Sequence, residues 1–482
     1  MKGDFTRNTF NPLKHFTRVL MQQGRVQLDA DWNEQTAILL HYLQTLAADL
    51  IGQHGGPDDG FKIIQRMDKN NKPVEYDFSI QAGHYYVRGL LCENEKATGY
   101  TEQDDYPLPD EEKIDSMKRI DDPKRLYLVY LDVWERHITY LEDGRIEDPN
   151  IREVALGVPD TATRARLVRQ VKIHVMPQDL KLVTTEVAED WIKKNLIVLS
   201  KAHLRARAKI EQPFTDPCTI SPDARYRGAE NQLYRVEVHR SGLAWDKDKK
   251  DATQKQAATF KWSRENGSVI FPISDLAGDV VTLKHLGRDS RFGLAVGDWV
   301  EIVDDDYVLQ NRADPLLKVK AIDPLKMQVT LDGSPEKVKI KPGVDKHPLL
   351  RRWDHKRGDP RQGGLTISKD TEGAALIVEG EDETGWLMLE DGIQIQFQTP
   401  KSADQPNHYR TGDYWLIPAR TATGDVEWPG PSDNPDPLEP HGVEHHFAPL
   451  AVITLGTNGE VNTPANSDLR RKFKSLVQLT TP

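Results

Sequence analysis

Two short stretches of the sequence carry side chains whose types and spacing could bind a metal ion. In the first, Asp29, Asp31 and Asn33 occupy the first three ligand positions of a helix-loop-helix calcium loop. The pattern then fails, because Glu34 stands where the loop needs glycine and Leu40 stands where a bidentate glutamate should close the site. Asp31 also precedes Glu34 by the spacing of a capping box. We therefore predict that a helix starts at Asp31, in place of a calcium site.

The second stretch is rich in histidine and contains His441, Glu444, His445 and His446. Neighbouring residues on a strand point to opposite faces, so His445 and His446 cannot both join His441 around one ion without a bend. We expect structural roles for these side chains, no bound metal and no other cofactor. If a metal ion is bound, its candidate ligands are His441, His445 and His446.

No short signature of a catalytic site occurs in the sequence. Gly-x-Ser-x-Gly, His-Glu-x-x-His, Gly-x-x-x-x-Gly-Lys, Gly-x-Gly-x-x-Gly and Cys-x-x-Cys are all absent. Asp304, Asp305 and Asp306 are adjacent carboxylates, and we interpret them as an exposed turn between strands because glycosidase pairs face each other across a cleft. We expect a protein that is not an enzyme. A glycan or peptidoglycan hydrolase is the less favoured alternative.

Several tryptophans in the second half of the chain could stack on sugar rings. Tryptophans more often anchor cores and protein interfaces, which we expect for most of these. A glycan-binding module is therefore an alternative function. The residues concerned are Trp262, Trp299, Trp353, Trp386, Trp415 and Trp428.

Composition narrows the class of protein further. The chain has 482 residues, 38% of them hydrophobic, and a formal net charge of −11, which disfavours nucleic acid and anionic membrane surfaces as partners. No apolar run is long enough for a membrane helix, and the start lacks the apolar core of a secretory signal. The two cysteines, Cys92 and Cys218, cannot form a disulfide framework. We expect synthesis and assembly in the cytoplasm, with later release outside the cell as part of a particle.

The elements that would position these residues begin with a strand and a helix. Val26 and Leu28 alternate with polar residues, which predicts a short strand before the helix. Apolar residues then recur every three or four positions from Trp32 to Leu50, and Gly52 ends the pattern. This apolar face, led by Trp32, is expected to dock on the β-rich remainder or on a neighbouring subunit.

The rest of the chain is rich in β-strand signals, so we predict a mainly β, α+β protein of several antiparallel sandwiches or barrels. Hairpins are predicted at Ala82–His84, Asn266–Gly267 and Asp391–Gly392. The strands between Asp279 and Asp332 predict a small barrel or sandwich. Four domains are expected, namely an N-terminal arm, strand and helix (1–57), a β-rich domain with short helices (58–224), a barrel or sandwich (225–345) and a C-terminal β domain with a Pro-rich loop (346–482).

Several long motifs are spread along the chain. Two of them, KGDFTRNTFNPLKHF and MQQGRVQLDADWNEQ, lie near the amino terminus. Others are GAENQLYRVEVH from 228, TFKWSRENGSVIFPI from 259, GRDSRFGLAVGDWVEIVDD from 287 and YRTGDYWLIPART from 409. Together these motifs resemble an uncharacterised bacterial family found in gene clusters for phage-tail-like contractile injection particles.

This resemblance implies a structural part of a multi-subunit, tail-like particle, at the baseplate, its shell or a fibre attachment. The partners would be other subunits of the particle, in an oligomeric assembly, without nucleic acid or membrane insertion. Docking is expected through aromatic and basic residues of the first twenty positions and through the helix. These residues are Phe5, Arg7, Phe10, Phe16, Arg18 and Trp32.

Overall fold

Two compact units make up the protein, and each is assembled from three separate stretches of the chain. Unit 1 contains residues 1–8, 137–164 and 199–443, and unit 2 contains residues 9–136, 165–198 and 444–482. The chain was analysed as a computed structural model. The structure describes residues 1–108, 125–143, 151–153, 155, 160–177, 183–197, 200–209, 225–246, 256–287, 293–335, 346–367, 370–402, 405–456 and 458–474. Cys218 and part of the predicted 58–224 domain lie outside them.

The predicted fold class is confirmed, because most of the regular structure is antiparallel β-sheet. The four contiguous domains stay a prediction. In the described part of the chain, no helix combines the length and the apolar content needed to cross a bilayer.

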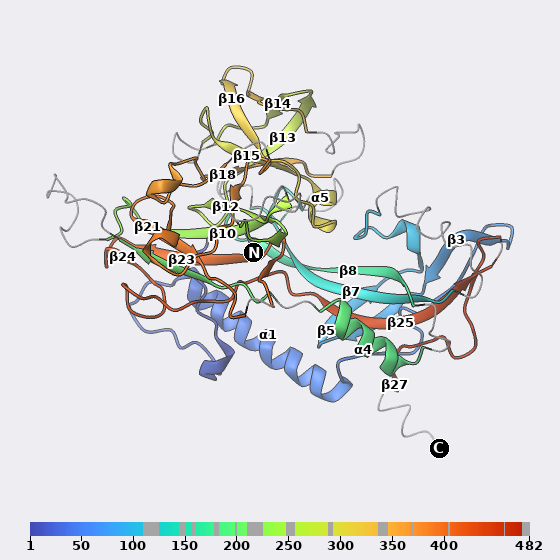
Figure 1. Cartoon of the computed structure of the whole chain (residues 1–482). Coiled ribbons are helices and arrows are strands. Elements are labelled where there is room, and N and C mark those ends of the chain that lie inside the picture. The colour runs from blue at the N-terminus through green and yellow to red at the C-terminus, as the bar shows by residue number, and fades with distance from the viewer. Residues whose placement is uncertain are drawn as a thin grey trace, which may run out of the picture. The chain divides into compact units, whose positions relative to one another are not determined.

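Unit 2 contains three small sheets with the strand orders β27-β1-β4-β5, β2-β3-β6 and β26-β25-β7-β8. Figure 1 labels six of these strands, namely β3, β5, β7, β8, β25 and β27. The pair β1–β27 is parallel, whereas β1–β4, β4–β5, β2–β3, β3–β6, β25–β26 and β25–β7 are antiparallel. The strands are β1 (His54–Pro57), β2 (Ile63–Met67), β3 (Pro73–Ile80), β4 (Gly83–Val87), β5 (Leu90–Asn94), β6 (Thr98–Gly99), β7 (Tyr127–Ile138), β8 (Arg164–Val175), β25 (His446–Leu455), β26 (Val461–Asn462) and β27 (Lys472–Phe473).

Strand β7 is apolar on both faces because each face is covered. Val129 and Leu131 point into the main core of unit 2. Leu128 and Tyr130 point to the other side, where they pack with Ile192 of helix α4 (Thr185–Asn195). The sequence of β7 therefore lacks the apolar and polar alternation of a half-exposed strand.

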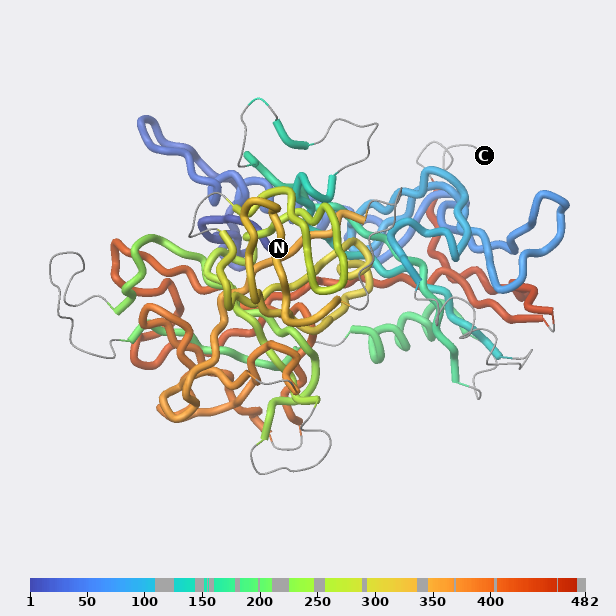
Figure 2. Tube along the Cα trace, turned by 90° about the horizontal axis from the view of Figure 1, so that it is seen from above, coloured from blue at the N-terminus to red at the C-terminus, as the bar shows by residue number. Residues whose placement is uncertain are grey.

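Helix α1 (Asp29–Ile51), labelled in Figure 1, also belongs to unit 2. Figure 2 shows the blue loop that the residues before it form. The helix ends where predicted, at Gly52, whose φ of 96° suits glycine. Its start was predicted wrongly, because the helix begins at Asp29 and its cap, Leu28, offers no side-chain acceptor. The predicted strand at Val26 and Leu28 is also wrong, since residues 25–28 pair with no strand in the part of the chain that the structure describes, and both side chains are exposed.

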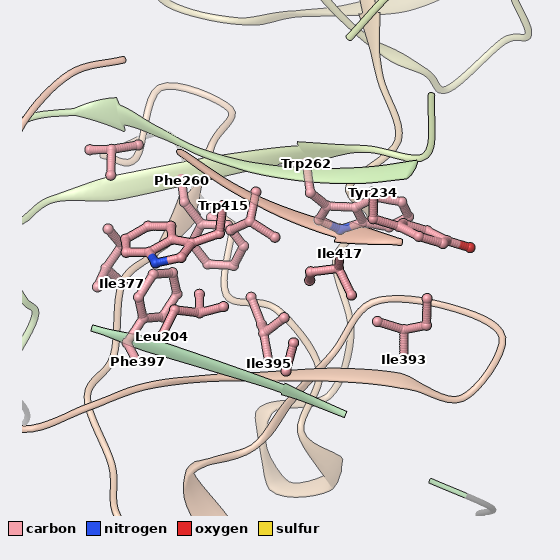
Figure 3. Packing of buried hydrophobic residues seen from close by; sticks show 14 of the residues in the cluster. Leu204, Tyr234, Phe260, Trp262, Ile377, Ile393, Ile395, Phe397, Trp415 and Ile417 are labelled. Atoms are coloured by element: carbon pink, nitrogen blue, oxygen red, sulfur yellow. The ribbon is translucent and has the colours of Figure 1, made fainter. Parts of the chain in front are cut away.

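Unit 1 contains a sandwich with a large apolar core. A five-stranded sheet, β19-β12-β10-β23-β24, packs on the sheet β20-β21-β9, and Figure 3 shows Phe260, Trp262 and Trp415 of the first facing Leu204 and Phe397 of the second. The strands are β9 (Leu204–Ala208), β10 (Gln232–Arg240), β12 (Thr259–Ser263), β19 (Ala375–Leu376), β20 (Leu387–Met388), β21 (Ile393–Phe397), β23 (Tyr414–Arg420) and β24 (Asp425–Val426). A further pair joins β11 (Gly242–Leu243) to β22 (His408–Tyr409).

The second part of unit 1 is a closed barrel of order β13-β14-β17-β16-β15-β18, which confirms the barrel predicted for this region. Inward residues such as Phe271, Val300 and Leu350 fill it, as alternation along a barrel strand requires. The strands are β13 (Ile270–Ala277), β14 (Val280–Leu283), β15 (Trp299–Val303), β16 (Leu317–Asp323), β17 (Gln328–Leu331) and β18 (Leu349–Trp353).

Two of the three predicted hairpins are wrong. Strands β3 and β4 flank Ala82 but do not pair, and the hairpin is β4–β5, with its turn at Arg88 and Gly89. At Asn266–Gly267 both residues have positive φ, yet β12 joins the sandwich and β13 joins the barrel. Asp391–Gly392 does connect paired strands, β20 and β21. A turn fixes the chain direction locally, whereas pairing depends on which sheet buries each strand.

Candidate functional site

The six residues predicted to dock on a partner divide between the two units. Phe5 and Arg7 belong to unit 1, whereas Phe10, Phe16, Arg18 and Trp32 belong to unit 2.

Residues 1–8 form a segment that is bound into unit 1. The side-chain amide of Asn266 donates to the carbonyl of Gly3 at 2.8 Å, and Arg420 donates to the carbonyl of Thr6 at 2.9 Å. The ring of Phe5 meets His137 edge-on, with centroids 6.1 Å apart. Arg7 forms only a half-exposed pair with Glu427 at 3.4 Å, which contributes little. The Asn266–Gly267 turn thus holds this segment instead of closing a hairpin.

Within this segment, Lys2 contacts a buried cluster of charged residues on the outer face of the five-stranded sheet. Its Nζ lies 2.9 Å from Oε1 of Glu237, and Nε of Arg235 lies 2.5 Å from the other oxygen. Lys261 stands 3.5 Å from the same carboxylate. Burial alone would raise the pKa of Glu237, but the charges of Lys2, Arg235 and Lys261 hold it well below its ordinary value. The carboxylate is therefore ionised.

Glu301, on the outside of the barrel, is the second carboxylate of this cluster. Lys261 Nζ lies 2.5 Å from its Oε1, Trp353 Nε1 donates to Oε2 at 3.0 Å, and the Tyr307 hydroxyl donates to Oε1. Burial would raise the pKa of Glu301, but Lys261 and Lys2 lower it to about 2. Both carboxylates are only 2% exposed, so the cluster holds parts of unit 1 together and presents no acid to solvent.

Two buried histidines adjoin the cluster. Within the described residues, neither ring nitrogen of His239 has a hydrogen-bond partner, while Nε2 of His355 lies 2.8 Å from the carbonyl of Gly373. Burial, together with the charge of Lys261, lowers the pKa of His239 to about 3. Burial also lowers the pKa of His355 to about 4. Both imidazoles are therefore neutral at ordinary pH.

The arm, defined as residues 9–28, lies in unit 2 beside α1. Thr9 donates to Glu34 at 2.7 Å, the amide of Val19 donates to Gln35 at 2.8 Å, and the ring of Phe10 lies 5.9 Å from that of His41. The arm is largely exposed. Its exposed large apolar side chains are Leu13, Phe16, Leu20, Met21, Val26 and Leu28.

Helix α1 contacts its own unit through the side opposite its apolar stripe. Ala30 and Ile38 are its buried residues, and a Cβ placed on Gly89 would come within 2.2 Å of the Gln44 carbonyl. The β4–β5 turn therefore packs directly on the helix backbone. The predicted apolar stripe points away and is exposed, with Trp32 65% accessible and Leu50 77% accessible. The large exposed side chains of α1 are Trp32, Leu39, Leu40, Tyr42, Leu43, Leu46 and Leu50.

One comparison with known proteins gives a match that covers nearly the whole chain. Residues 1–181 and 186–462 match the model of a family described as "Family of unknown function (DUF6519)". The chain belongs to this family. The matched residues include the arm, α1 and the buried cluster, so these features lie within the family's domain. Neither the search of curated proteins nor that of solved structures produced a match.

The remaining candidates from the sequence occupy structural positions. His441 belongs to unit 1 and pairs its backbone with Tyr414, whereas His445 belongs to unit 2 and lies 2.7 Å from Asp132. His446 starts β25, opposite Val133. Among the described residues, no three His, Cys, Asp or Glu side chains are grouped as metal ligands.

The aspartates at 304–306 were predicted as an exposed turn, and this is wrong. Asp304 is buried and caps the short helix α5 (Asp305–Leu309), accepting from the amide of Tyr307 at 2.7 Å. Asp305 pairs with His347 at 2.8 Å, and Asp306 pairs with Lys346. The six tryptophans singled out above are buried or half-buried, as expected for core and interface anchors.

Sequence reasoning missed the buried cluster because its signal is ambiguous. Arg235, Glu237 and His239 alternate with Tyr234, Val236 and Val238 along β10, a pattern that predicts a solvent-exposed polar face. The barrel strand β15 and residues 1–8 cover this face instead. One usable signal was that three cationic side chains, Arg235, Lys261 and Arg351, each directly follow a large apolar residue within a strand.

Proposed function

We propose that this protein is a structural subunit of a larger protein assembly and that it docks through the arm and α1. One observation carries the proposal: the apolar stripe of a 23-residue helix faces away from the unit that anchors it. A contiguous exposed patch of this kind is rare on a monomeric protein and is typical of protein interaction sites. The stripe is flanked by the arm, which adds further exposed apolar side chains.

The assembly that we propose is a phage-tail-like contractile injection particle. The support is the resemblance of the opening motifs, KGDFTRNTFNPLKHF and MQQGRVQLDADWNEQ, to proteins of such gene clusters. These motifs encode the segment bound into unit 1, the arm and the start of α1. The subunit would be made in the cytoplasm and would act at the baseplate, its shell or a fibre attachment.

The use of carboxylates in unit 1 supports a structural role. Glu237 and Glu301 share one cation, Lys261, and both carboxylates are buried among positive charges. A hydrolase of glycans needs one protonated and one ionised carboxylate facing a substrate. The cations around Glu237 and Glu301 instead hold both of them ionised.

The experiment compares particles isolated from cells that carry the intact gene, no copy of the gene, or the double variant Leu39→Glu and Leu46→Glu. Electron microscopy of the particles should show a layer or attachment that is missing without the gene. The double variant should be produced in normal amount but should not be incorporated, because two charges interrupt the stripe.

A matched control is Leu325→Glu, a change at an exposed leucine in the barrel of unit 1. This variant should be incorporated normally. Particles that contain no trace of the protein, or that look the same with and without the gene, would refute the assembly role.

A further inference from the structure

The exposed stripe of α1 has the spacing of a coiled-coil seam. Trp32, Leu39 and Leu46 follow one another at intervals of seven residues. Thr36, Leu43 and Leu50 each stand four residues after one of these, in the same order. These alternating steps of four and three define d and a positions over three heptads. A helix that only covers its own core usually turns such residues inward, whereas here Ile38 and Ala30, outside the seam, are the buried ones.

The seam is suited to burial against a similar surface. It contains no charged residue between Trp32 and Leu50, and the hydroxyl of Thr36 already donates to the carbonyl of Trp32 at 3.1 Å. Leu40 and Tyr42 widen it on either side. Burying the seam would also cover the indole N–H of Trp32 and the hydroxyl of Tyr42, polar tips of large apolar rings that can hydrogen-bond at the edge of a contact.

The exposed area is large enough for a stable contact between subunits. If each large side chain has a full surface on the order of 200 Å², the exposed fractions of the seven large side chains of α1 correspond to roughly 800 Å². A standard interface buries about 800 Å² on each partner. The apolar side chains of the arm bring the available surface above that size.

Charge complementarity points to a second copy of this chain as the occupant. The arm contains Lys14, Arg18 and Arg25 and no acidic residue. Helix α1 contains Asp29, Asp31, Glu34 and Asp49 and no lysine or arginine. In a two-fold arrangement, the basic arm of each copy can meet the acidic helix of the other, so one surface supplies both halves of the interaction.

We propose that residues 9–51 form a self-association interface in which the Trp32–Leu50 seam packs against the same seam of a second copy. The basic arm of each copy lies along the acidic residues of the other copy's helix. This inference rests on the docking role proposed above and names its partner. The contact is isologous, so it closes on itself and does not generate a filament.

The test uses the full-length chain and measures its mass by light scattering during size-exclusion chromatography. The wild type should have twice the chain mass, because the two-fold contact joins two copies. The variant Leu39→Glu with Leu46→Glu should fall to the mass of one chain, while its thermal unfolding midpoint stays unchanged because both leucines are exposed. Leu325→Glu, with a still more exposed leucine, should keep the wild-type mass.

A second measurement does not depend on charged substitutions. The variant Leu43→Cys places a thiol near the middle of the seam. It is made in a chain in which both native cysteines, Cys92 and Cys218, are changed to serine. Mild oxidation should link two copies through Cys at this position. The same change at Leu325 should give no linked product. Arg18→Glu with Arg25→Glu should weaken association and reduce its sensitivity to salt.

A wild-type chain that stays monomeric at its highest soluble concentration, with no cross-link at position 43, would overturn the inference. If the seam variant then still failed to enter particles, the stripe would bind a different subunit, and the assembly role would stand. If the wild type self-associated but particles were complete without it, the inference would stand and the proposed function would fail.

Discussion

Lys2 Nζ lies 2.9 Å from Glu237 Oε1, so the beginning of the chain neutralises a buried carboxylate in the middle of β10. Glu237 also contacts Arg235 and Lys261, and Lys261 continues to Glu301 on the barrel. One connected set of charges therefore joins the first residues, the five-stranded sheet and the barrel of unit 1. Such a set is costly to break, because each remaining charge stays buried without its partner.

Replacing Glu237 with glutamine should strongly destabilise unit 1. Lys2, Arg235 and Lys261 would lose their shared counter-charge, and removing one partner of a buried ion pair costs about 3–5 kcal/mol. Chemical denaturation followed by tryptophan fluorescence measures the loss. The control is Asp190→Asn, which removes an exposed pair with Lys194 at 2.6 Å and should cost less than about 1 kcal/mol. Equal effects of the two changes would show that the cluster is not a stabilising network.

The stability of the protein should fall as the pH is lowered from 6.5 to 5. The pKa of His239 in the folded protein, about 3, is below the ordinary 6.5, so in this window the unfolded chain binds a proton that the folded chain does not. Each such histidine contributes a loss of about 1.4 kcal/mol per pH unit. His355, with a pKa of about 4, acts in the same direction.

His239→Leu should make this pH dependence shallower and should not reduce stability at pH 7, because the ring forms no hydrogen bond among the described residues. Denaturation midpoints at several pH values test it. His408→Leu, at an exposed position of β22, is the control and should keep the wild-type slope. If His239→Leu leaves the dependence of stability on pH unchanged, the pKa of His239 does not differ between the folded and the unfolded protein.

Gly89→Ala should displace α1 from unit 2. Its Cβ would come within 2.2 Å of the Gln44 carbonyl, and the φ of +79° adds strain. We expect a loss of about 3 kcal/mol or more, because neither backbone can give way easily. Gly278→Ala, with a φ of +65° and nothing within 4 Å, carries the strain without the clash and should cost about 1 kcal/mol. Comparable losses would indicate that the helix does not rest on this turn.

Adjacent residues of α1 should respond to truncation in opposite ways. Ile38→Ala, at a side chain only 1% exposed, should cost about 2–4 kcal/mol of stability and leave self-association intact. Leu39→Ala, at a half-exposed seam position, should change stability by less than about 0.5 kcal/mol and weaken self-association. Denaturation and light scattering on the same samples separate the effects. A large stability loss for Leu39→Ala would show that the stripe is part of the unit's own core.

Local elements were predictable because they depend on near neighbours in sequence. The end of α1 at Gly52, the hairpin at Asp391–Gly392 and the four barrel strands β14 to β17 follow from glycine conformation and from strand alternation. The sixth barrel strand, β18, was not predicted, because its two arginines made it look like a polar connector. Asn266–Gly267 has the same turn chemistry as Asp391–Gly392, with positive φ at both residues. Its flanking strands nevertheless separate, because Phe260 is buried in the sandwich and Phe271 in the barrel.

The sequence by itself determined that the Trp32–Leu50 segment is an amphipathic helix, since its apolar period needs no knowledge of distant residues. It could not determine whether that apolar face is covered, because a core-facing stripe and an interface have the same period. The tertiary structure decided this by placing the β4–β5 turn against Gln44 and leaving Trp32 exposed. It likewise decided that the polar face of β10 is buried, because Lys2 and Glu301 come from distant parts of the chain.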